Sequence, residues 1–308
     1  MRSSLESAGL GASLHTVVSN SKLGPMAPEW QAKLQLEFER RRGGTTLARS
    51  LHEGPLRVQR PFYPEGPCGA CHVYVLHPPG GVVSGDRLLV DVHLAEHTQA
   101  LLTAPGANKL YRARTDASAS LLQRFTVGAS ATVEWLPPET IAFASTRARL
   151  NTQIELAAEA TYAGWEILCL GRPAAGELFS QGELKTELSV RRADKLVHLE
   201  RGRYVGGDAM LQAPWGMRGQ PVLGTFMVAS PRADASWVEA VREGTSSPHS
   251  EHAAHGGTFA VTLVSGILIA RYLGGSTREA RALFERVFSV LRPLYAGCAA
   301  VHPRIWST

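Results

Sequence analysis

The chain has 308 residues, of which 44% are hydrophobic and 19% are charged. These proportions are typical of a folded protein with a sizeable core, and they exclude an intrinsically disordered chain. The 32 basic and 27 acidic side chains leave a formal net charge of +5. This surplus is too small and too dispersed to indicate nucleic-acid binding.

The sequence contains no segment that approaches the roughly 20 apolar residues of a membrane-spanning helix. The first residues hold no apolar run of signal-peptide length. Four cysteines in a chain of this length do not make a disulfide framework. We therefore expect a cytoplasmic protein that does not associate with a membrane.

Composition predicts one large domain with a tail and one long loop. Residues 1–28 are rich in Ser and Gly and show no sustained periodicity, which predicts a flexible N-terminal tail. Residues 244–257 are polar and low in complexity, which predicts a mobile loop. No shift of composition divides residues 29–308, so we predict a single domain over that range.

From Trp30 onward, apolar and polar residues alternate in short runs. Leu34, Leu36 and Phe38 alternate with polar residues, so that they share one face of a strand. Comparable runs recur at 72–76, 88–94, 121–127, 132–136, 153–156, 165–170, 184–190, 222–229 and 259–272. Gly and Pro residues separate many of these runs. Many short strands with frequent turn signals predict a mainly β fold.

Two segments have the pattern of helices. Residues 236–239 have the Ser-x-x-Glu spacing of a capping box, which predicts a short helix that Gly244 closes. Residues 276–279 repeat this spacing ahead of an apolar stripe, which predicts a longer helix near the C-terminus. Pro293 is expected to kink or end that helix.

Cys68-x-x-Cys71-His72 has the spacing of a haem-attachment or redox motif. Haem attachment of this kind normally requires export, and a redox pair usually lies at a helix N-terminus, whereas this pair precedes a predicted strand. A structural zinc site needs four ligands, and there is no second pair. We interpret the pair as accidental and keep a thiol oxidoreductase as an alternative.

Gly80 and Gly85 have the spacing of a phosphate-binding loop. Asp86 stands where that loop requires Lys, and a carboxylate there would repel a nucleotide. We therefore exclude nucleotide binding at this loop. We interpret the segment as a bend whose Ser84 and Asp86 face a polar interior, with a plain turn as the alternative.

Three histidines, His249, His252 and His255, recur at a spacing of three in the predicted mobile loop. Imidazole suits divalent nickel, copper and zinc, so the triplet is a candidate metal site. A solvated loop is the alternative, because Pro248 and two following glycines disfavour the helix that would align the three rings.

Three carboxylates, Glu139, Glu166 and Glu177, lie in or beside the ends of apolar strands. A buried carboxylate is costly unless it is paired or hydrated. Ion pairs, for example with Arg172, would account for them, and so would a water-filled internal passage.

The chain has no Gly-x-Ser-x-Gly elbow and no His-Glu-x-x-His motif. We therefore predict no catalytic residues and no tightly bound cofactor, and keep a hydrolase of unknown substrate as an alternative. A third class, a metal-storage protein, would depend on the histidine loop.

Several of these segments resemble the UreD (UreH) family of urease accessory proteins. The resemblance runs from about Trp30 to the C-terminus. The similar blocks occur in the family's order at 54–66, 71–86, 103–112, 134–141, 164–177 and 303–306.

The resemblance implies a β-rich, non-enzymatic maturation factor for urease. It implies a complex with the accessory protein UreF, the GTPase UreG and apo-urease, and it leaves open a homodimer within that complex. It also implies transient nickel(II) on an internal passage. We expect that passage to be lined or gated by Ser84, Asp86, Glu139, Glu166, Arg172 and Glu177.

Overall fold

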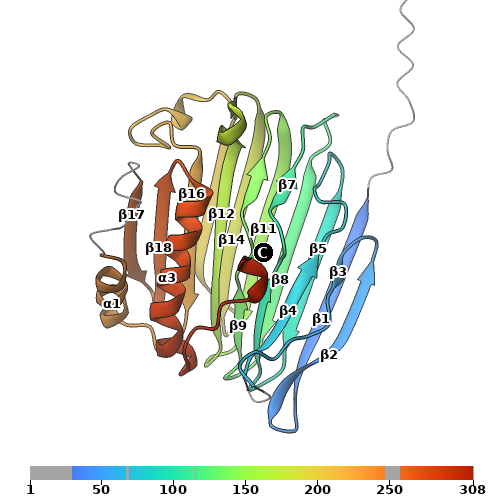
Figure 1. Cartoon of the computed structure of the whole chain (residues 1–308), viewed down its shortest axis with the longest axis vertical. Helices are drawn as coiled ribbons and strands as arrows, with labels where there is room; N and C mark the ends of the chain where they lie inside the picture. The colour runs from blue at the N-terminus through green and yellow to red at the C-terminus, as the bar shows by residue number, and fades with distance from the viewer. Residues whose placement is uncertain (1–29, 67–68, 115, 247–256, 308) are drawn as a thin grey trace, which may run out of the picture.

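The computed structural model describes residues 30–66, 69–114, 116–246 and 257–307. About half of the chain is strand and about 15% is helix, so the predicted mainly β class is confirmed. Two sheets lie face to face, and α-helices cover the outer side of one of them (Figure 1).

The smaller sheet, here called sheet I, has seven strands among the described residues. They are β1 (Gln31–Arg41), β2 (Gly44–Glu53), β5 (Arg87–Leu94), β8 (Ala119–Val127), β11 (Thr146–Leu156), β14 (Gly182–Arg192) and β15 (Lys195–Val205).

The larger sheet, sheet II, has eleven strands within the described ranges. They are β3 (Arg57–Val58), β4 (Cys71–Leu76), β6 (Gln99–Thr103), β7 (Asn108–Leu110), β9 (Thr132–Trp135), β10 (Thr140–Ala142), β12 (Thr161–Arg172), β13 (Glu177–Leu178), β16 (Val222–Ala229), β17 (Thr258–Val264) and β18 (Ile267–Gly274).

From β4 to β14 the chain passes back and forth between the two sheets, as in a solenoid. Because each crossover returns the chain in the same direction, β5, β8, β11 and β14 pair in parallel, and so do β4, β6, β9 and β12. The four sheet I strands begin at residues 87, 119, 146 and 182. This irregular spacing explains why the sequence shows no repeat of fixed period.

Strand β12 is buried on both faces. Tyr162 and Leu168 belong to the core between the sheets, whereas Trp165 and Ile167 belong to the core beneath the helices. A strand covered on both sides reads as a nearly continuous apolar run, which is the pattern at 165–170.

Several sequence predictions need correction. The run at 259–272 is two strands, β17 and β18, because Ser265 and Gly266 adopt positive φ angles of 52° and 73° and turn the chain back as a hairpin. Strands β2, β6 and β15 were not predicted. Their shorter or more polar stretches do not alternate clearly, and pairing with a neighbouring strand fixes them instead.

The helical layer consists of α1 (Ala235–Thr245) and α3 (Thr277–Ala296). Ser276 caps α3 as predicted, accepting a hydrogen bond from the Glu279 backbone N–H at 3.3 Å. The cap of α1 is Asp234 and not Ser236, because its carboxylate accepts the Ser236 N–H at 2.9 Å. Short 3-10 turns occupy Pro173–Ala175, Ala209–Leu211 and Arg304–Ser307.

The predicted ends of both helices were wrong. Helix α1 runs one residue past Gly244. Pro293 does not end α3, which continues to Ala296 and closes at Gly297, whose φ of 74° is left-handed. Proline lacks the N–H that would bond to the carbonyl four residues back, and α3 stops three residues after it.

A buried ionic cluster fastens α3 to sheet II. Arg292 is 1% exposed and donates hydrogen bonds to Glu134 of β9 at 2.8 Å and to Glu65 at 2.7 Å. Tyr295 donates to the same Glu134 oxygen at 2.7 Å. His72 lies 2.8 Å from Glu65, so one cation joins two carboxylates from distant parts of the chain.

The cluster favours the ionised form of Glu65 inside the protein. Burial alone would raise the pKa of Glu65, but hydrogen bonds from His72 and Arg292 hold that pKa below its ordinary value. Arg292 has two carboxylate partners, so its own buried charge is not left unpaired.

Replacing Arg292 with Met should lower the free energy of unfolding by about 3 to 5 kcal/mol, because both carboxylates would stay buried without their partner. Urea denaturation measures this loss. Arg278, on the exposed side of the same helix, is the matched control, and Arg278→Met should change the free energy by less than about 0.5 kcal/mol. Equal losses in the two variants would contradict the proposed anchoring.

Candidate functional site

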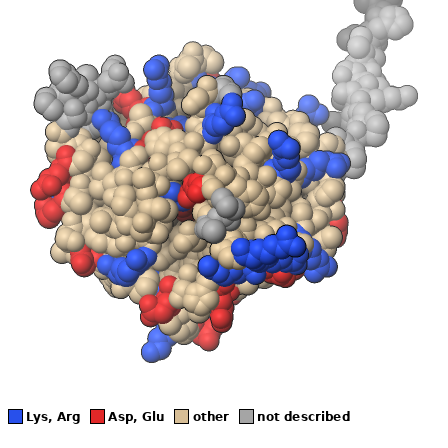
Figure 2. Space-filling model, turned by 60° about the horizontal axis from the view of Figure 1, so that its bottom comes forward, with Lys and Arg blue, Asp and Glu red and all other residues tan. Residues whose placement is uncertain are grey.

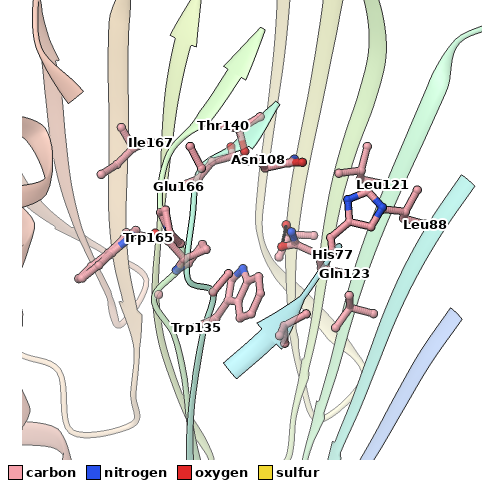
Figure 3. Close-up of a pocket in the computed structure, with 18 of the residues that line it drawn as sticks. His77, Leu88, Asn108, Leu121, Gln123, Trp135, Thr140, Trp165, Glu166 and Ile167 are labelled. Atoms are coloured by element: carbon pink, nitrogen blue, oxygen red, sulfur yellow. Dashed lines mark hydrogen bonds between the residues drawn. The ribbon is translucent and has the colours of Figure 1, made fainter. Parts of the chain in front are cut away.

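A cavity of about 410 Å³ lies between the facing sides of the two sheets (Figure 3). Its walls come from β5, β8, β11 and β14 of sheet I and from β4, β9, β12 and β16 of sheet II. Most of the lining is apolar. The polar lining side chains are those of His77, Asn108, Lys109, Gln123, Thr140, Thr152, Glu166 and Thr225.

Glu166 is the carboxylate in the cavity wall. Its neighbours Trp165 and Ile167 point toward the helices, so the two-residue period of β12 turns Glu166 toward the opposite sheet. It accepts no hydrogen bond from another described residue. Burial, and then the negative charge of Glu200, raise the pKa of Glu166 to about 7. Near neutral pH this carboxyl is therefore divided between its neutral and ionised forms.

His77 follows β4 at another part of the cavity wall. Its Nε2 atom is buried and has no hydrogen-bond partner in the described part of the chain. Burial lowers the pKa of His77, and the charge of Asp86 opposes that shift. Strands β4 and β12 are three positions apart in sheet II, about 14 Å at the usual strand spacing. His77 and Glu166 therefore do not share one ligand.

The bend at 80–87 is held by the two residues predicted there. Asp86 is 4% exposed, and its carboxylate accepts the backbone N–H groups of Trp30 and Val83, each at 3.0 Å. The Ser84 hydroxyl accepts the backbone N–H of Arg114 at 2.9 Å. Both side chains stabilise loop structure beside the cavity, and neither lines it.

Arg172 and Glu177 pair with each other. The Arg172 Nε donates to Glu177 at 3.0 Å, and the other oxygen of this carboxylate accepts the Ala144 N–H at 2.8 Å. These bonds hold the pKa of Glu177 below its ordinary value, with Arg172 as the main cause. The Arg172 guanidinium also lies over the ring of Phe143, 4.4 Å from its centroid. Glu139 is half-buried between two lining residues, Pro138 and Thr140.

The topology brings five of the six predicted passage residues to one end of the sandwich, whereas Glu166 lies in the middle of β12. Ser84, Asp86, Glu139 and Glu177 lie in crossovers from sheet II to sheet I, and Arg172 ends β12 where such a crossover begins. The parallel strands of sheet II all end on this side. The cavity reaches the same crossovers at Gly80, at 104–109 and at 137–138. Glu166 alone among the six lines the cavity.

The described residues include only part of the cysteine motif and none of the histidine triplet. Cys68 and the triplet His249, His252 and His255 lie outside the described residues. Cys71 is buried, and burial raises the pKa of its thiol, which works against the thiolate that redox chemistry needs. The described residues contain no group of three or more His, Cys, Asp or Glu side chains arranged to hold a metal ion.

Sequence reasoning missed the other polar groups of the cavity. Gln123 carried a usable signal, because it occupies an inward position between the buried Leu121 and Phe125 of β8. Its side-chain oxygen accepts the Thr152 hydroxyl at 3.2 Å. His77 lies in a loop and Asn108 begins the three-residue strand β7, so no periodicity shows that their side chains point inward.

The described helices include none that is long and apolar enough to cross a membrane.

Comparison with known proteins gives the family. Residues 31–307 match the family described as UreD urease accessory protein. The urease accessory protein UreD of Azoarcus sp. (strain BH72) is 45% identical, with 91% of this chain and 95% of that protein covered. UreD of Dechloromonas aromatica (strain RCB) is 44% identical, with 92% and 96% covered. UreD of Methylobacillus flagellatus is 42% identical, with 94% and 99% covered. With a match this long and this close, the chain belongs to the UreD family of urease accessory proteins.

Proposed function

We propose that this protein is a non-enzymatic maturation factor that helps to deliver nickel to apo-urease, and that the cavity between its sheets is part of the route. The observation that carries the proposal is the position of Glu166, a carboxylate without a hydrogen-bond partner among the described residues, in an otherwise mostly apolar cavity. Within the family to which the chain belongs, such a group has a clear use, because it attracts a divalent cation.

The chemistry of the cavity supports passage more than storage. A single carboxylate with scattered amide, hydroxyl and imidazole groups and one ammonium, that of Lys109, offers few ligands at any one point, so a divalent ion binds weakly and moves on. A tight site would need several ligands around one point. Ser84, Asp86, Glu139, Arg172 and Glu177 then shape the crossover end through which the ion passes.

Exposed apolar side chains and uncharged surface areas support the proposal that the protein works in a complex. Trp215, in a loop, is 79% exposed and Leu178, in the short strand β13, is 72% exposed, and both lie at the crossover end. Figure 2 shows, at the opposite end of the molecule, broad areas without Lys, Arg, Asp or Glu side chains. Uncharged areas of this kind are common where proteins bind each other. The partners in the proposal are UreF, the GTPase UreG and apo-urease in the cytoplasm, with no nucleic acid.

The first prediction concerns urease itself. Replacing Glu166 with Gln keeps the size of the side chain but removes its charge, so urease matured with this variant should contain less nickel, by about tenfold if the charge contributes about 1.4 kcal/mol to passage. Metal analysis of purified urease, co-expressed with the variant and its accessory partners, measures the loss.

Glu187→Gln is the control for this experiment. Glu187 lies on the outer side of sheet I, paired with Arg201 at 2.7 Å and away from the cavity, and its variant should give a normal nickel content. Both variants should co-purify with urease as the parent does. A normal nickel content with Glu166→Gln would reject the proposed route.

The second prediction concerns pH. The pKa of Glu166 is about 7 in the folded protein and about 4.3 in an unfolded chain. Between these values the folded state holds a proton that the unfolded state has released, so the parent loses stability as pH rises toward 7. The Glu166→Gln variant has no ionisable carboxyl at this position, so its stability does not fall for this reason. Relative to the parent, the variant should gain on the order of 2 kcal/mol between pH 5 and pH 8.

Urea denaturation of both proteins at pH 5 and pH 8 measures this difference. Glu187→Gln again serves as the control and should follow the parent at both pH values. A constant difference between Glu166→Gln and the parent would show that Glu166 has an ordinary pKa.

A further inference from the structure

The sandwich has an open side where β15 of sheet I faces β18 of sheet II; we call this side the seam. Strand β15 is the last strand of sheet I, and among the described strands its backbone pairs with β14 alone. Side chains therefore have to close the seam. Arg271 of β18 donates to both carboxylate oxygens of Glu200 of β15, at 2.6 and 2.7 Å.

This ion pair does not itself line the cavity, but it lies against two residues that do. The Arg271 Nη1 also lies 3.3 Å from the hydroxyl of Thr225, which lines the cavity. Glu200 is the cross-strand partner of Leu188, another lining residue. On its other side the pair meets solvent, since the side chains of Arg271 and Glu200 are 47% and 33% exposed. The pair thus separates the cavity from solvent at the seam.

Glu166 stands directly behind this pair. Glu166 pairs with Thr225 across β12 and β16, and Thr225 pairs with Arg271 across β16 and β18. The three residues thus form one row that faces sheet I. The electrostatic effect of Glu200 on Glu166, and of both carboxylates on Tyr204 of β15, places Glu166 and Glu200 near each other. The guanidinium of Arg271 lies at the end of this row that is exposed to solvent.

The pair stays ionised across the physiological range. Burial would raise the pKa of Glu200, but His198 and Arg271 lower it to about 2. Protonation therefore does not open the seam near neutral pH. A competing cation or a competing carboxylate can open it, because either one replaces a member of the pair.

We propose that the Glu200–Arg271 ion pair is the gate of a side portal that joins the cavity to the surface at the seam. With Arg271 turned away, Glu200 and Glu166 present two carboxylates in succession to a divalent cation. With Arg271 in place, its positive charge repels such a cation and the portal is closed. As a route for nickel, the portal rests on the function proposed above, whereas the closure of the seam is a property of the chain alone.

Access to the cavity tests the gate without nickel. Leu188→Cys places a thiol in the cavity wall beside the pair. A small cationic methanethiosulfonate reagent reports how fast this thiol is reached, as measured by mass spectrometry of the peptide that contains it. The parent chain without this substitution gives the background from its native cysteines.

In the Leu188→Cys protein, the double change Glu200→Gln and Arg271→Gln should speed labelling about tenfold, the factor that corresponds to about 1.4 kcal/mol of closing free energy. The charge reversal Glu200→Arg with Arg271→Glu restores a pair and should return labelling toward the starting rate. The matched control is Glu187→Gln with Arg201→Gln, a pair between β14 and β15 on the outer side of sheet I, and it should leave the rate unchanged.

Salt gives a second measurement that needs no change to the ion pair. Because the pair is partly exposed, raising the NaCl concentration weakens it. Labelling of the Leu188→Cys protein should therefore speed up with salt, and the neutral double variant should not respond. Equal labelling rates in all pair variants, or the same salt response with and without the pair, would overturn the gate.

The experiments distinguish a failure of the proposed nickel route from a failure of the proposed gate. If Glu166→Gln lowers the nickel content of urease but the seam variants label at the starting rate, the gate is wrong and the route stands. If the seam variants label faster while Glu166→Gln leaves the nickel content normal, the gate closes a cavity that nickel does not use.

Discussion

The two-residue period of β12 constrains the interior of this protein. Because the strand is covered on both faces, the side chains along most of its length must enter one of two cores. The bulky Trp165 enters the core beneath the helices, and Glu166 is consequently directed between the sheets. A one-residue change of register would exchange the two positions. The backbone therefore fixes the direction of the carboxylate before any ligand is considered.

The buried carboxylates of this protein differ in how far basic partners balance their negative charge. Glu65 and Glu134 share Arg292, and this pairing suits an anchor for a helix. Glu200 shares Arg271 at the edge of the cavity, where solvent weakens the pair. Glu166 has no basic partner within reach of a hydrogen bond in the described structure. The least compensated carboxylate is the one best able to bind a passing cation, and the most compensated ones contribute most to stability.

The fold class and the capping of α3 could be predicted from the sequence, because alternation and a capping box are local patterns. The pairing of β1 with β5 could not, because it depends on contacts between distant residues. The same distinction holds for the site. Glu166 was predicted from its place in an apolar strand, whereas Arg271 and Glu200 are 71 residues apart and look like ordinary surface charges in sequence. The roles of the loop residues Ser84 and Asp86 emerge only from their bonds to backbone groups of other segments.

The most direct test of the central claim is to locate the ion. Crystals of this protein in complex with apo-urease, soaked in nickel, would be measured at the nickel absorption edge. We predict anomalous density within bonding distance of the Glu166 carboxylate, and its loss in crystals of the Glu166→Gln variant. Anomalous density confined to the outer surface, or density in the cavity that is unchanged by that substitution, would contradict the account.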